Sequence, residues 1–176
     1  MADPTTWIDV ADSAVKVGFG LLIGGGISFL HAYFDHDREL KKESAKRQLD
    51  KIEVIFNDIN EFSQTIALFW ANLANGVHKK EKNSLTELDI ESLENEEQNV
   101  FEKFNVINSA RTKLLLINDK HSVLKLDAYK TSCESFFKIA HIENGNCTKE
   151  NLNNHKKLMI ELRDKLLSSV SNKYTI

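Results

Sequence analysis

The sequence has very little proline or glycine outside one short stretch. Its only proline is Pro4, and five of its seven glycines lie between Gly18 and Gly26. Proline and glycine mark turns and interrupt helices, so a chain that lacks them over most of its length favours long helices. No segment shows sustained alternation of apolar and polar residues, which argues against half-buried strands. We therefore predict an all-α protein.

Three further absences limit the function. The two cysteines, Cys133 and Cys147, are too few for a disulfide framework. The net charge of −3 provides no global basic field for nucleic acid. The six histidines form no H-E-x-x-H or H-x-x-x-H pair, and no set of cysteines and histidines has zinc-site spacing. The sequence therefore predicts no metal, cofactor, nucleic-acid partner or small-molecule substrate, and it contains no catalytic constellation of an enzyme.

What the sequence does contain is a run of 18 residues without Asp, Glu, Lys or Arg, from Val17 to Phe34. A transmembrane helix needs about 20 mostly apolar residues. At about 1.5 Å per residue the run reaches about 27 Å. Trp7 and Tyr33 are placed near its two ends, as interfacial aromatic residues often are. We therefore predict that residues 1–35 form an outside, periplasmic N-terminus and a single transmembrane helix.

Basic residues are distributed unequally around this run. Lys16 is the only one before it, whereas six follow it closely: Arg38, Lys41, Lys42, Lys46, Arg47 and Lys51. Short flanks rich in Lys and Arg remain in the cytoplasm. We therefore expect a single-pass protein of the cell inner membrane, with residues 36–176 as a cytoplasmic domain. This plan resembles that of many small bacterial membrane proteins.

One side of the predicted span is small and polar. Gly20, Gly24 and Ser28 repeat every four residues, and such a row lets two membrane helices approach closely. Near the same side lies a polar stripe of Asp9, Ser13, Lys16 and His31. In lipid, polar groups face protein or water. We therefore predict a helix-packing face, and with it a homo-oligomer or a contact with another protein.

Two other interpretations of the run remain open. One is a soluble helix that packs its glycine face on the rest of the protein, and the other is an amphipathic helix that lies in the membrane interface. A nucleotide site does not fit. The spacing G-x-G-x-x-x-G is one residue longer than the dinucleotide fingerprint, and no strand is predicted before it.

Apolar residues after the charged segment recur with helical spacing. The clearest period lines one face of a helix over roughly 36–75 with Ile52, Ile55, Ile59, Phe62, Ile66, Phe69 and Leu73. Weaker periods follow over three later segments. Four amphipathic helices with short connections predict an antiparallel up-down bundle over residues 36–176.

Local signals suggest where these helices begin and end. Asn75 and Gly76 predict a C-cap, with a polar loop over 77–83. Ser84 and Glu87 fit a capping box that opens the second helix. The remaining boundaries are predicted at Asn118-Asp119, at the turn over 143–146 and at Thr148.

Several side chains of the bundle have two interpretations. Trp70 lies beside the apolar face of the first helix, so it belongs either to a second packing face or to an exposed aromatic anchor for a partner. We take it as the candidate partner-binding residue. Cys133 is predicted in the core and Cys147 as an exposed thiol. The carboxylates of residues 86–98 are predicted to form a solvated face.

These features predict a membrane-anchored, non-catalytic helical-bundle protein. It would self-associate or bind a protein partner at the cytoplasmic membrane face. The alternative is a membrane-perturbing effector, such as a toxin or defence component, whose N-terminal helices assemble in the bilayer. The polar stripe favours this alternative. A third possibility is an enzyme whose site the sequence does not reveal.

Overall fold

The computed structural model describes residues 39–172, and in that range it contains four α-helices and no β-strand. The helices are α2 (Glu39–Glu81), α3 (Glu87–Leu116), α4 (Lys120–Ile139) and α5 (Lys149–Asn172). The predicted all-α fold with four helices is thus confirmed for the described part of the chain. The chain divides into two compact units, one that ends at Val54 and one that begins at Ile55. The helical bundle belongs to the second unit.

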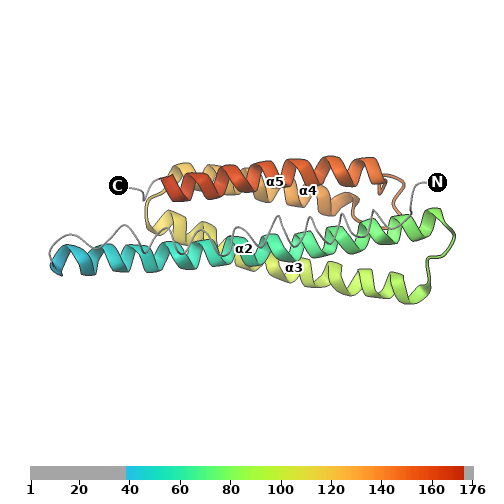
Figure 1. Ribbon diagram of the computed structural model, residues 1–176, viewed down its shortest axis with the longest axis horizontal. Coiled ribbons are helices and arrows are strands. Elements are labelled where there is room, and N and C mark those ends of the chain that lie inside the picture. Colours follow the sequence, from blue (N-terminus) through green and yellow to red (C-terminus); the bar gives the residue numbers. More distant parts are fainter. Residues whose placement is uncertain (1–38, 173–176) are drawn as a thin grey trace, which may run out of the picture. The chain divides into compact units, whose positions relative to one another are not determined.

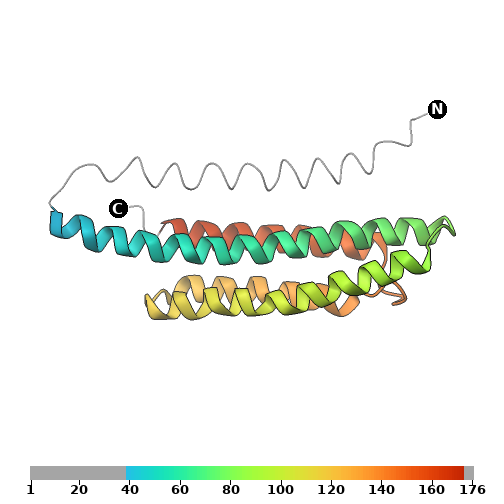
Figure 2. The ribbon, with the colours of Figure 1, turned by 90° about the horizontal axis from the view of Figure 1, so that it is seen from below.

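Short connections make consecutive helices of the second unit antiparallel neighbours, as Figures 1 and 2 show. Lys113, near the end of α3, lies 2.6 Å from Asp58 in α2. Arg111 Nε lies 2.7 Å from Asp127 Oδ1 and joins α3 to α4. Partly exposed ion pairs of this kind contribute only about 0–1 kcal/mol each. These ion pairs therefore show which positions of neighbouring helices face each other, and most of the stability comes from the core.

The predicted apolar face of α2 is buried. Its members in the second unit are each at most 3 % exposed: Ile55, Ile59, Phe62, Ile66, Phe69 and Leu73. The Phe62 and Tyr129 rings meet edge-on with centroids 6.1 Å apart, and those of Phe69 and Phe136 lie 5.9 Å apart. Aromatic pairs attract in this geometry. Since each buried side chain of this size contributes about 1.5–3 kcal/mol, the α2 face supplies much of the driving force for folding.

The C-terminal end of α2 differs from the prediction. The helix does not end at Asn75 and Gly76 but continues to Glu81, so most of the predicted loop is helical. Gly76 is buried, and a Cβ atom there would lie 2.8 Å from Ile142 Cδ1 and 2.9 Å from Leu93 Cδ1. Gly76 therefore permits close packing of α3 and the α4–α5 connection on α2. This packing offsets the cost of glycine inside a helix, which is about 1 kcal/mol relative to alanine.

Replacing Gly76 by leucine is expected to lower the free energy of unfolding by about 1–3 kcal/mol, because the new side chain must displace Ile142 and Leu93. Gly76→Ala is the matched control. Its methyl group displaces only the ends of two flexible side chains, and the gain of about 1 kcal/mol in helix propensity offsets that cost. Urea unfolding followed by circular dichroism measures both variants. A leucine variant as stable as the parent would contradict close packing at Gly76.

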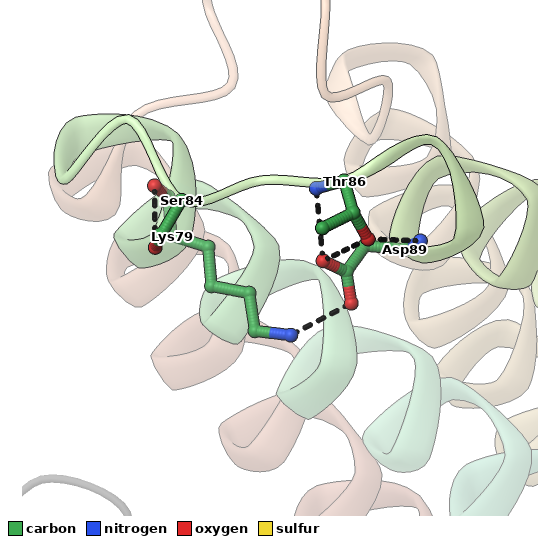
Figure 3. A network of polar contacts seen from close by, with 4 residues as sticks. All are labelled: Lys79, Ser84, Thr86 and Asp89. Carbon is green, nitrogen blue, oxygen red and sulfur yellow. Dashed lines mark hydrogen bonds and ion pairs between the residues drawn. The ribbon is translucent and has the colours of Figure 1, made fainter.

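The start of α3 is a capping box, but not the predicted one (Figure 3). Asp89 N donates to Thr86 Oγ1 at 3.2 Å, and Thr86 N donates to Asp89 Oδ2 at 3.0 Å. The predicted pair of Ser84 and Glu87 is wrong, since Ser84 Oγ donates to Lys79 O instead. Lys79 Nζ lies 2.7 Å from Asp89 Oδ1, and hydrogen bonds from Lys79 and then Thr86 lower the pKa of Asp89 from 3.8 to about 2. A contact from α2 thus helps to select the first turn of α3.

The end of α3 and the starts of α4 and α5 agree with the prediction, whereas α4 ends at Ile139, before the predicted turn over 143–146. α3 ends just before Asn118, whose φ of 56° is a left-handed conformation that asparagine tolerates. Ser122 N donates to the side chain of Asp119 at 3.2 Å, which caps α4. Asn151 N donates to Thr148 Oγ1 at 3.3 Å at the start of α5. At these positions the local sequence suffices to place the boundary.

Candidate functional site

The predicted helix-packing face and the predicted polar stripe of the N-terminal span both lie outside the described residues. They are Gly20, Gly24, Ser28, Asp9, Ser13, Lys16 and His31. Among the helices between residues 39 and 172, none is both long and apolar enough to cross a membrane. Trp70 is therefore the one predicted site residue that lies within the described range.

Trp70 is buried in the bundle. Its side chain is 4 % exposed, and its indole Nε1 donates to the backbone oxygen of Leu152 in α5 at 2.9 Å. The interpretation of Trp70 as an exposed partner-binding anchor is therefore wrong, and the alternative of a second packing face holds. The physical reason is that α2 has a further neighbour, α5, on the flank next to its main apolar face.

A lysine lies over the Trp70 ring. Lys156 Nζ in α5 is 3.9 Å from the ring centroid, within the range of a cation–π interaction. Burial lowers the pKa of Lys156 from its usual value of 10.5. Leu152, one helical turn earlier, accepts the indole hydrogen bond. α5 thus contacts both the edge and the face of Trp70, so this side chain joins α2 to α5.

A buried chain of hydroxyl groups joins α2 to α4. Ser63 Oγ donates to Ile59 O at 2.7 Å, and Ser63 Oγ and Tyr129 OH lie 2.9 Å apart. Because the Ser63 proton is used on Ile59, we assign Tyr129 as the donor in the second bond. Burial raises the pKa of Tyr129 well above 10. The phenol therefore stays protonated at neutral pH, and its contacts are those of a structural group.

Neither cysteine is placed for nucleophilic chemistry. Cys133 lies in the core as predicted, and burial raises its pKa to about 12. The exposed position predicted for Cys147 is wrong, because this side chain is only 7 % exposed and burial raises its pKa as well. The connection that carries it packs against α2, where Lys80 Nζ donates to Ile142 O at 2.6 Å. Since the thiolate is the reactive form, the raised pKa values disfavour reaction of both thiols at neutral pH.

The acidic segment of α3 is only partly the solvated face that the sequence predicts. Glu91 and Glu94 are exposed, but Glu96 is half-buried. Asn72 Nδ2 donates to Glu96 Oε1 at 2.6 Å, while Glu96 Oε2 is buried and has no hydrogen-bond partner in the described structure. Burial raises the pKa of this carboxyl group. Glu96 is thus the titratable group of the acidic segment whose environment most resembles that of a functional site.

The surroundings of Glu96 do not complete such a site. The carboxyl group lines a shallow hollow of about 370 Å³ together with Leu88, Glu91, Ser92, Asn95 and Asn99. All six lining residues belong to α3, and among the described residues the amide of Asn72 in α2 is the one group from another helix that binds Glu96. No group of three or more side chains that could ligate a metal occurs between residues 39 and 172. The lining of the hollow therefore offers Glu96 no catalytic or ligating group from a second helix, and its one contact from another helix in the described structure is the hydrogen bond from Asn72.

The turn between α3 and α4 carries exposed leucines that the sequence analysis did not single out. Leu115, Leu116 and Leu124 are 46 %, 80 % and 68 % exposed. Two lysines accompany them, Lys120, which is exposed, and Lys125, which is half-buried. We refer to these five residues as the α3–α4 corner. Large apolar side chains that stay in water together with lysines are characteristic of a surface that contacts a partner or a membrane.

Comparisons of the chain with protein families, with curated proteins and with solved structures give no match. No residue role is therefore taken from another protein. The functional proposal rests on the residues and contacts of this chain alone.

Proposed function

We propose that this protein is a membrane-anchored, non-catalytic helical bundle that self-associates or binds a protein partner at the cytoplasmic face of an inner membrane. The observation that carries the proposal is the uncharged run from Val17 to Phe34, followed at once by a basic segment. A run of this length and composition matches a short membrane span, and the basic flank matches a cytoplasmic side.

The bundle supports a non-catalytic role. Burial raises the pKa values of Tyr129 and Cys133 and so favours their neutral forms. The aromatic side chains of Phe62, Phe69 and Trp70 contact neighbouring helices. These features favour a rigid domain that binds partners through its surface, and they do not favour an enzyme.

Membrane fractionation tests the anchor. The full-length protein is expected in the membrane pellet and to remain there after alkaline carbonate extraction. Deletion of residues 17–34 should move it to the supernatant. Fusions after Ile176 test the orientation, with a fluorescent protein expected to be active and alkaline phosphatase inactive. Complete release of the full-length protein by carbonate would sink the proposal.

The packing face of the span provides a second prediction. Gly20→Leu combined with Gly24→Leu should preserve or improve membrane insertion but strongly reduce cross-linked oligomers, because two isobutyl groups fill the groove between helices. Leu22→Ala, on the opposite side of the predicted helix, is the control and should cross-link like the parent. Equal oligomer yields from parent, control and double variant would show that the glycines do not mediate assembly.

The polar stripe of Asp9, Ser13, Lys16 and His31 supports the second candidate, a membrane-perturbing effector. Assembled helices with such a stripe would place polar groups along a shared interior. Reconstitution into dye-loaded vesicles distinguishes the two functions. Ion or dye release that rises with protein concentration favours the effector, whereas intact vesicles favour the anchored bundle.

A further inference from the structure

We propose that the α3–α4 corner is a second membrane contact of this protein and that it binds the surface of an anionic lipid bilayer. This inference rests on the proposed function, because an anchored bundle is held next to the membrane. It adds a site in the described structure to the anchor predicted from the sequence. In the proposed contact, the exposed leucines of the corner enter the headgroup layer of the bilayer, and its lysines contact lipid phosphates.

The register of α3 and α4 brings the leucines together. The ion pair of Arg111 with Asp127 fixes two facing positions, with 2.7 Å between Arg111 Nε and Asp127 Oδ1. Leu115 follows Arg111 by four residues and Leu124 precedes Asp127 by three, so each lies one helical turn toward the connection on the same flank. Leu116 adjoins Leu115 and is the most exposed of the three. The corner is therefore one apolar surface made from two helices.

The five residues of the corner include two lysines and no acidic side chain. From Lys103 to Lys130 there are six basic side chains and two acidic ones, although the net charge of the protein is −3. Asp119 is buried as the N-cap of α4. Four of the six basic side chains, Lys103, Arg111, Lys113 and Lys130, form ion pairs with acidic side chains. The charges that remain are those of Lys120 and Lys125 in the corner. A locally basic, leucine-bearing surface complements anionic headgroups over an apolar layer. This complementarity favours lipid over a second copy of this acidic protein.

The corner lies at the end of the second unit where α2 enters it. Lys113, in the last turn of α3, contacts Asp58, which is close to where α2 enters the second unit. Ser122 Oγ lies 2.9 Å from Ser169 Oγ, so α5 ends there too, as Figures 1 and 2 show. The α3–α4 turn therefore lies at the end of the second unit where its part of α2 begins, whereas the α2–α3 turn lies at the other end.

The test places an environment-sensitive fluorophore on the full-length protein at Leu116→Cys. Lys82→Cys, exposed in the α2–α3 turn, is the matched control. Both natural thiols are buried and have raised pKa values, so brief maleimide labelling at neutral pH modifies the introduced cysteine. Labelled protein is reconstituted into vesicles of phosphatidylcholine alone or with phosphatidylglycerol. Blue shift of the emission and quenching by nitroxide lipids are measured, and vesicle flotation is recorded in parallel.

We expect a blue shift and strong quenching at position 116, but not at position 82, in the anionic vesicles only. Lys120→Glu combined with Lys125→Glu should lower the ratio of docked to undocked corner at least about tenfold, since each near-surface lysine contributes severalfold to the partition. Circular dichroism should show that both labelled proteins and the charge variant are folded.

Three results would overturn the inference. The label at 116 could remain as exposed to water as the label at 82, it could shift equally without anionic lipid, or it could become shielded in detergent as protein concentration rises, which would identify a second copy as the occupant. Flotation separates this inference from the proposed function. Protein that floats with a water-exposed corner contradicts only the corner, whereas protein that fails to float with either vesicle contradicts the anchor.

Discussion

Replacing Ile59 by aspartate is expected to abolish the cooperative thermal unfolding of the bundle. Ile59 has no exposed surface and lies at the centre of the apolar face of α2. An unpaired carboxylate at such a position costs several kcal/mol. Domains of this size have a total stability of about 5–15 kcal/mol. Far-ultraviolet circular dichroism during heating measures the effect, and we expect a weak, gradual loss of signal in place of a transition.

Leu68→Asp is the matched control for this prediction. Leu68 lies on the same helix but is 56 % exposed, so the introduced charge stays in water. Its effect should lie within about 0.5 kcal/mol of the parent. A cooperative transition at the parental temperature in Ile59→Asp, or similar losses in both variants, would contradict the assignment of α2 faces. The comparison therefore tests burial and not merely the presence of aspartate in a helix.

The apolar face of α2 could be predicted because its signal is repetitive. Residues such as Ile59, Phe62 and Ile66 each follow the helical period, and one misplaced residue would not change the face. The four-helix architecture follows from the same kind of signal in later segments together with short connections. The caps at Asp119 and Thr148 were also predictable, since a cap is a contact between residues three apart.

The end of α2 could not be predicted because its cause is remote in sequence. Asn75 followed by Gly76 is a local signal for a helix end, yet Gly76 is enclosed by Leu93 and Ile142. Those contacts become available only once α3 and the α4–α5 connection have packed. The start of α3 behaves similarly, because Lys79 of the preceding helix binds Asp89. Helix boundaries that depend on tertiary contacts remain outside the reach of local rules.

The side chains of functional interest also divide into those with a local sequence signal and those whose environment depends on residues far away in the sequence. The exposure of Leu115 and Leu116 had a local signal, since three consecutive leucines from Leu114 cannot all face one core. Leu114 is fully buried and the other two are exposed. Trp70 had no such signal. Its neighbours, Leu152 and Lys156, are more than 80 residues away in the sequence, so its burial depends on where α5 lies.

Replacing Trp70 by alanine should therefore lower the free energy of unfolding by roughly 3–5 kcal/mol, the usual cost of deleting a buried large aromatic side chain. Trp70→Phe keeps an apolar ring and loses the hydrogen bond to the Leu152 carbonyl, so we expect a loss nearer about 1 kcal/mol from that bond. Urea unfolding of the full-length protein in mild detergent, followed by circular dichroism, measures both. Alanine and parent proteins of equal stability would contradict the role of Trp70 in joining α2 to α5.

Lys156→Met isolates the cation–π part of this contact. Methionine retains the length of the side chain but removes the charge that lies 3.9 Å from the Trp70 ring centroid. In the parent background it should cost about 0.5–2 kcal/mol, less the gain from no longer burying an ammonium group. In the Trp70→Ala background that cost should disappear, because the ring it depends on is gone. Equal effects of Lys156→Met in the two backgrounds would mean that Lys156 stabilises α5 without the tryptophan, and Trp70 would then join the helices through packing and its hydrogen bond alone.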